Sequence, residues 1–127
     1  SQSRLQKLYV ESSGLDDLFF MAIVELLPTS RLEVLSVKGN IGAQGILVFA
    51  NQLPRIKFLK DVDLSGNPWE NSTQREVCMA ALVLGLRANG SIERIKKYRF
   101  DSDPWEMEMV HCTFINRLRQ RILPTNP

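Results

Sequence analysis

Apolar residues recur along the chain in one fixed frame, apolar-x-x-apolar-x-apolar-x-x-Asn. The frame spans Leu32–Asn40 and Leu59–Asn67, and with Ser13 or Asp103 in the last position it also spans Leu5–Ser13 and Ile95–Asp103. The alternation inside each copy predicts a short strand with one apolar face. The asparagine suits the turn that follows, because a short amide side chain can hydrogen-bond the backbone there.

Between these strands the apolar period lengthens to that of a helix. The predicted helical stripes lie within residues 15–26, 46–53, 77–86 and 109–122. Asp16 or Asp17 is expected to begin the first helix, since a short carboxylate can accept from the free N–H groups of the first turn.

The strand, turn and helix return as one unit. Asn67 follows Asn40 by 27 residues, and Asp103 follows Asn67 by 36. A unit that returns in this way predicts a solenoid, in which each copy buries its apolar faces against its neighbours. We therefore expect one α/β domain over residues 1–127, with about four units at 3–30, 31–58, 59–94 and 95–123.

The second and third units resemble a known family. The run Leu32-x-x-Leu35-x-Val37-x-x-Asn40-Ile41-Gly42-x-x-Gly45, continued by Phe49-Ala50-x-x-Leu53, resembles the leucine-rich repeat of the ribonuclease-inhibitor-like class. Leu59-x-x-Val62-x-Leu64-x-x-Asn67 is a second match, whereas the first unit lacks the turn Asn and Gly and the fourth has Asp103 and aromatic strand residues. The resemblance implies parallel strands on a concave face, helices on a convex face, and a function in binding other proteins.

The two ends of the chain differ from the repeats. Residues 105–123 predict a longer amphipathic helix with arginines near its end, which we interpret as a capping helix with a polar outer face. The first strand, from about Leu5, is expected to leave an open sheet edge. We expect further repeats or another chain to cover that edge, so that the chain is a segment or subunit of a larger assembly.

Composition and charge narrow the partner classes. Of the 127 residues, 44% are hydrophobic, and the net charge of +2 gives no general reason to expect a nucleic-acid partner. The longest apolar stretch, Leu18–Leu27, is too short to span a membrane and contains Glu25, so no membrane insertion is expected. Two cysteines are too few for a disulfide framework, which favours an intracellular, cytoplasmic location, or an organelle if the N-terminus is processed.

Few residues suggest catalysis or metal binding. His111 and Cys112 are neighbours on a predicted helix and point about 100° apart, so they do not form a nucleophile–base pair. Two cysteines and one histidine are too few for a zinc site, and Asp61 with Asp63 lacks the further oxygen ligands of a cation site. We expect the chain to have no catalytic activity and to bind no cofactor or metal ion. Asn71 and Asn89 each begin a glycosylation triplet, a weak signal that leaves their modification open.

The candidate binding residues are the strand positions that point away from the apolar frame. Strand alternation places them together on the concave face. They are Lys7, Tyr9 and Glu11; Val34, Ser36 and Lys38; Asp61, Asp63 and Ser65; and Lys97, Arg99 and Asp101. This mixed-charge grid has an acidic middle row and a basic last row, which suits electrostatic selection of a protein partner; an ordinary solvated sheet face is the alternative. Trp69 and Trp105, just beyond the strands, are interpreted as packed covers of adjacent repeats rather than exposed anchors.

The preferred hypothesis is a non-catalytic recognition or scaffold module that binds a protein through its concave face or its open N-terminal edge. Two alternatives stand beside it, the first suggested by the shared repeat class and the second by the basic end of the last helix. One is a GTPase-activating module similar to the Ran GTPase-activating proteins, and the other is an actin-capping fragment similar to the tropomodulin C-terminal domain.

Overall fold

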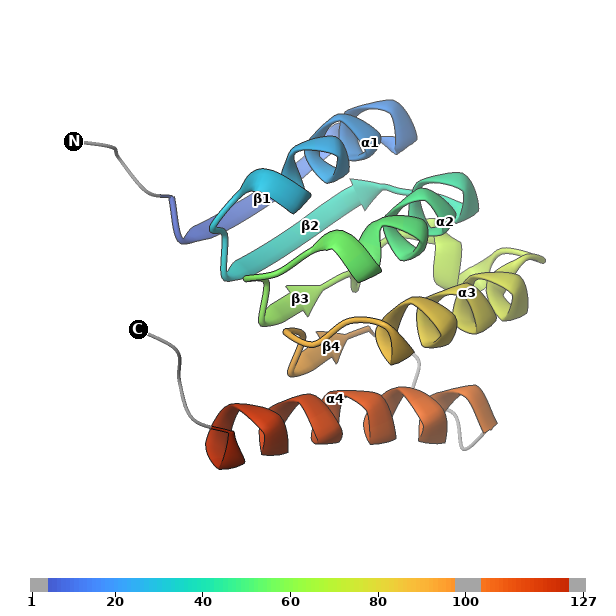
Figure 1. Ribbon diagram of the computed structural model, residues 1–127. Helices are drawn as coiled ribbons and strands as arrows, with labels where there is room; N and C mark the ends of the chain where they lie inside the picture. Colours follow the sequence, from blue (N-terminus) through green and yellow to red (C-terminus); the bar gives the residue numbers. More distant parts are fainter. Residues whose placement is uncertain (1–4, 98–103, 124–127) are drawn as a thin grey trace.

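The computed structural model describes residues 5–97 and 104–123. Its four strands form one parallel sheet in the order β1-β2-β3-β4, with strand bounds Lys7–Asp16, Val34–Asn40, Asp61–Asp63 and Arg94–Lys96. Figure 1 shows the strands side by side in chain order, with α1, α2 and α3 stacked beside them in the same order. The predicted α/β repeat solenoid is confirmed.

The helices follow the strands at regular intervals. Their bounds are Asp17–Leu26 for α1, Ala43–Gln52 for α2, Arg75–Arg87 for α3 and Pro104–Ile122 for α4, and the 3-10 turns are Leu27–Thr29, Leu53–Arg55 and Pro68–Asn71. Asp16 caps α1, since its Oδ1 accepts from the Phe19 N–H at 3.1 Å. None of the helices within residues 5–97 and 104–123 is long and apolar enough to cross a membrane.

The core lies between the sheet and the helices and is built in layers. Each repeat helix contributes three buried positions with the same spacing, namely Phe20, Val24 and Leu27 in the first unit, Ile46, Ala50 and Leu53 in the second, and Met79, Val83 and Leu86 in the third. The rings of Phe20 and Phe49 join the first two layers, with centroids 5.8 Å apart. Burying one large apolar side chain contributes about 1.5–3 kcal/mol, so these layers supply much of the stability.

The fourth unit does not follow the predicted register. The sequence frame aligned Ile95 with Leu59, but in the sheet Ile95 pairs with Val62, and the buried Ile92 takes the place that the frame assigned to Ile95. The sequence frame treated Asp103 as the equivalent of Asn67, and Pro-Trp-Glu follows both residues. That tripeptide begins a 3-10 turn at Pro68 and the long helix α4 at Pro104, so it does not mark equivalent places. The aromatic strand residues of the fourth frame, Tyr98 and Phe100, and its turn residue Asp103 lie outside the described residues.

α4 covers the β4 end of the molecule, as expected of a capping helix, but its two faces are reversed in character. Its buried residues are mostly polar or small: Glu106, Met109, Cys112, Thr113 and Asn116. Its outer face carries an apolar stripe: Met107, Val110, Phe114, Leu118 and Ile122. The predicted polar outer face is wrong. The inner face is polar because it bonds the main chain before β4, for example through the Asn116 amide, which donates to the Ile92 carbonyl at 2.8 Å.

Candidate protein-binding face

In the part of the chain that the structure describes, one face of the sheet is left uncovered by helices (Figure 1), and its side chains form rows across the strands. We call this side the open sheet face; it is the side that the sequence predicts to be concave. One row, Lys7, Val34, Asp61 and Arg94, follows the strand register, as does the next, Tyr9, Ser36, Asp63 and Lys96. Glu11 and Lys38 begin a third row. The two aspartates of β3 therefore stand directly beside the two cations of β4.

Most of the predicted binding residues are where the sequence placed them. Those whose side chains reach solvent on this face are Lys7, Tyr9, Glu11, Val34, Ser36, Lys38, Asp61 and Asp63. Ser65 lies at the same face but is 7% exposed, because its hydroxyl and its N–H both donate to Asp63 Oδ1, at 2.6 and 2.9 Å. The open sheet face thus includes nine of the predicted positions, one of them largely covered.

The fourth-unit residues require a correction. The Lys97 side chain is only 4% exposed and forms an ion pair with Glu106 of α4, so Lys97 is not part of the open sheet face. Its placement was wrong because the register of β4 differs from the predicted one. Arg94 and Lys96 occupy the face instead, and sequence reasoning missed them; the apolar pair Ile92 and Ile95 carried the signal that would have found them. Arg99 and Asp101 lie outside the described residues.

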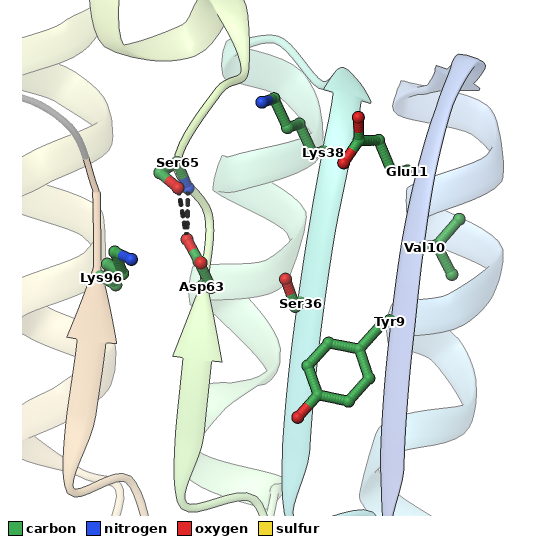
Figure 2. A pocket seen from close by; sticks show the side chains of 8 residues that line it. All are labelled: Tyr9, Val10, Glu11, Ser36, Lys38, Asp63, Ser65 and Lys96. Atoms are coloured by element: carbon green, nitrogen blue, oxygen red, sulfur yellow. Dashed lines mark hydrogen bonds between the residues drawn. The ribbon is translucent and has the colours of Figure 1, made fainter.

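The centre of this face is a shallow depression. It has a volume of about 330 Å³ and is lined by residues of all four strands and the turn after β3: Tyr9, Val10, Glu11, Ser36, Lys38, Asp63, Ser65 and Lys96. Figure 2 shows the Tyr9 ring beside Ser36 and the Asp63–Ser65 hydrogen bonds between Ser36 and Lys96. Tyr9 is 66% exposed, so the depression presents an aromatic ring, carboxylates and ammonium groups to solvent together.

A buried amide fixes the spacing of the strands beneath this face. Asn67 Oδ1 accepts from the Gly39 N–H at 2.8 Å and the Ile41 N–H at 3.3 Å, while Nδ2 donates to the carbonyls of Val37 and Leu64 at 2.9 and 3.0 Å. One side chain thus satisfies backbone groups of two units. In the preceding unit the carboxylate of Asp17 has a comparable role, since it accepts from the Gly42 N–H at 2.7 Å.

A second buried amide, that of Asn89, bonds the backbone of the segments that precede β3 and β4. Asn89 is 1% exposed; its Nδ2 donates to the carbonyls of Leu53 and Ile56 at 2.9 and 3.0 Å, and its Oδ1 accepts from the N–H groups of Ser91 and Ile92 at 2.9 and 2.8 Å. Asn89 is therefore a structural residue, although its triplet matches a glycosylation acceptor. Asn71, which begins the other triplet, is exposed.

Trp69 is packed, as predicted. It is fully buried, and its Nε1 donates to the Leu64 carbonyl at 3.2 Å. Trp105, at the start of α4, is partly buried against the core.

The cysteines have the character of core residues. Burial, with a smaller contribution from the Asp17 carboxylate, raises the pKa of the Cys78 thiol. Burial and the Glu108 carboxylate raise the pKa of Cys112, which Arg87 lowers in part. A raised thiol pKa keeps the sulfur protonated and poorly nucleophilic at neutral pH. Within residues 5–97 and 104–123, no three His, Cys, Asp or Glu side chains gather closely enough to hold a metal ion.

Comparison with known proteins gives a likeness in fold. No protein-family model matches the chain, and no curated protein is similar to it in sequence. Among solved structures, it is similar to leiomodin-1 actin-binding site 2, with a TM-score of 0.81 at 16% sequence identity. The match covers 91% of this chain and 66% of the leiomodin chain, so this chain spans about two thirds of that structure. The likeness shows a shared small fold of the leucine-rich-repeat type.

Proposed function

We propose that this chain is a recognition module of the ribonuclease-inhibitor-like repeat class, without catalytic chemistry of its own, and that it binds a protein partner through the open sheet face. The observation that carries the proposal is the arrangement of charge there. Asp61 and Asp63 stand in register beside Arg94 and Lys96, next to the exposed ring of Tyr9.

This arrangement favours selective binding of a protein. A carboxylate column beside a cation column attracts a partner surface that carries the opposite charges in the same order, and it repels a surface with the order reversed. Tyrosine provides a large contact area at a low cost in side-chain entropy, which makes Tyr9 a suitable anchor. Because the sheet and the Asn67 amide hold these groups in fixed positions, little ordering is needed on binding.

The test is capture of a partner by a charge-swapped chain. The double variant Asp63→Lys with Lys96→Glu exchanges two charges of the open sheet face and keeps the net charge. The matched control, Glu25→Lys with Lys57→Glu, exchanges two exposed charges away from that face. We expect partners retained by the wild type and the control, identified by mass spectrometry, to be lost from the first variant. Equal retention by all three chains contradicts binding through this face.

Actin is a second, narrower proposal for the partner. The similarity to leiomodin-1 actin-binding site 2 favours it, because the two chains share a fold over 91% of this chain. Binding of monomeric actin, measured by fluorescence anisotropy with the same pair of variants, tests it. No binding removes actin as the partner and leaves the recognition proposal to the capture experiment. The GTPase-activating hypothesis gains no support from this likeness.

A further inference from the structure

Among the described residues, the outer edge of β1 pairs with no other strand. β1 is the end strand of the sheet that the structure describes, and its segment Lys7–Glu11 pairs in regular register with β2. The Gln6 carbonyl accepts from the backbone N–H groups of Glu33 and Val34, so Gln6 points toward β2. Because backbone direction alternates along a strand, the N–H and C=O groups of Lys7, Tyr9 and Glu11 point away from β2, toward the free edge.

The same end exposes apolar side chains beside that edge. Leu8 and Val10 face the helix side of the sheet but are only partly buried. On α1, Phe19 is 64% exposed and Leu26 is 67% exposed. An exposed strand edge next to apolar side chains is a site for pairing with another chain.

The repeat itself shows which way Phe19 and Leu26 face. They precede the buried Phe20 and Leu27, just as Gly45 and Gln52 do in α2 and Cys78 and Gly85 do in α3. Those equivalent positions contact the preceding helix: a Cβ on Gly45 would lie 2.7 Å from Asp17 Oδ1, and one on Gly85 would lie 2.5 Å from the Ala50 carbonyl oxygen.

The residues at this end do not suit another unit stacked in the same way. The described repeats place Gly45 or Cys78 at the first contact position, where a Cβ on Gly45 would lie 2.7 Å from the Asp17 carboxylate and where the Cys78 thiol is buried. α1 has the Phe19 ring there. A unit at the spacing of α1 to α2 would have to accommodate this ring where the described repeats carry a glycine or a thiol, which favours an occupant that packs in a different geometry.

We propose that the occupant is a second copy of this chain, joined by antiparallel pairing of β1 with β1 about Tyr9. A closed two-fold pair of edge strands in one sheet is antiparallel, with the same residue of both chains on the axis. With Tyr9 on the axis, Lys7 of each copy stands opposite Glu11 of the other, and Leu8 stands opposite Val10. The outward backbone groups of Lys7, Tyr9 and Glu11 are those that form the new ladder.

Charge selects this register over its neighbours. An axis at Lys7 would place two lysines opposite each other, and an axis at Glu11 would place two glutamates opposite each other, both unfavourable on adjacent strands. The axis at Tyr9 gives two attractive pairs and one aromatic pair. In this arrangement the sheets continue into each other, and the apolar side of α1, with Phe19 and Leu26, turns toward its copy.

The test is the mass of the chain in solution, measured by sedimentation equilibrium over a range of concentrations. We expect a monomer–dimer equilibrium for the 127-residue chain. Lys7→Glu and Glu11→Lys should each weaken dimerisation about tenfold or more, because both cross-strand pairs become repulsive. The double variant Lys7→Glu with Glu11→Lys should dimerise like the wild type.

Mixing the two single variants tests the proposed register most directly. An equimolar mixture of the Lys7→Glu chain and the Glu11→Lys chain should form a heterodimer, because glutamate then faces lysine at both pairs. Circular dichroism verifies that each variant is folded, which is expected for substitutions of exposed residues. A wild-type chain that stays monomeric at all concentrations overturns the proposal, as does a mixture of folded variants that does not associate. No outcome depends on the partner of the open sheet face, since only this chain is present.

Discussion

The two ends of the sheet belong to the same repeat pattern but differ in how they are covered. At the β4 end, α4 covers the last repeat with bonded polar groups, the Lys97–Glu106 ion pair and the Asn116 amide on the Ile92 carbonyl. At the β1 end, Phe19 and Leu26 stay exposed on α1. The difference shows that a repeat unit cannot bury its own outer faces, and that a cover works by bonding backbone groups as well as by burying apolar area.

The largest expected effect comes from removing the amide that joins the β4 end to the preceding unit. Asn89→Ala would leave the carbonyls of Leu53 and Ile56 and the N–H groups of Ser91 and Ile92 without that partner. We expect the free energy of unfolding to fall by about 3–5 kcal/mol in urea denaturation, since each buried group left unbonded costs about 1–3 kcal/mol. Asn51→Ala, at an exposed asparagine of α2, should change it by less than about 0.5 kcal/mol.

A second experiment compares substitutions of an apolar side chain at the β4 end and at the β1 end. Met109→Ser on α4 removes a side chain that is 3% exposed and should cost about 2–4 kcal/mol of stability. Phe19→Ser on α1 removes a ring that is 64% exposed, so the monomer should lose less than about 1 kcal/mol. Thermal unfolding at low protein concentration measures both. A larger loss for Phe19→Ser would mean that the β1 end is already covered within this chain.

The sequence predicted the repeat better than it predicted the ends. The Leu-x-x-Leu-x-Val frame suffices for β2 and β3, because strand alternation is a local property. The stripe predicted within residues 77–86 locates α3 along the chain but not its buried face, since it includes Val77 and Leu84, which are exposed, and omits the buried Leu82 and Val83. The register of β4 was missed because Pro-Trp-Glu recurs in sequence while serving two different elements. The role of Asn89 could not be foreseen, since its carbonyl partners at Leu53 and Ile56 lie 36 and 33 residues away.

The candidate site was also predicted correctly on the strands whose register the repeat frame fixes, and wrongly on β4. Alternation placed Lys7, Tyr9 and Asp63 correctly on the open sheet face. Lys97 was misplaced together with the register, and Arg94 and Lys96 were missed for the same reason. The predictable part of the site is therefore the part that lies on strands whose register the repeat frame fixes.

The helix contact at Gly45 offers a smaller test of the spacing argument. Gly45→Ala introduces a Cβ 2.7 Å from Asp17 Oδ1, so the Asp17 carboxylate, which accepts from the Gly42 N–H, must shift. We expect a loss of about 1–3 kcal/mol, as for other overpacked sites. At the equivalent position of α1, Phe19→Ala removes side-chain volume instead of adding it. This variant should leave the stability of the monomer nearly unchanged while it weakens dimerisation. An unchanged stability for Gly45→Ala would remove the steric reason for favouring a different packing geometry at the β1 edge.

The smallest expected effect is a pH dependence that involves both cysteines. Burial raises the pKa of each thiol above its ordinary value, so the folded chain holds these protons more tightly than the unfolded chain. The corresponding stability is fully present below the unfolded pKa and is lost as the pH rises through the folded pKa. Urea denaturation should therefore show a decline in alkaline solution that is reduced in the Cys78→Ala variant. Equal declines in both chains would contradict the burial of this thiol.

A partner protein that docks on the open sheet face should shield the lysines of that face, and covalent footprinting of the complex measures this shielding. Lysine acetylation, read by mass spectrometry, compares Lys96 on that face with Lys57, an exposed lysine between the second helix and β3. We predict that the partner protects Lys96 strongly and leaves the labelling of Lys57 unchanged. Protection of Lys57 with free labelling of Lys96 would contradict the account, since it would place the partner away from the charge columns of β3 and β4.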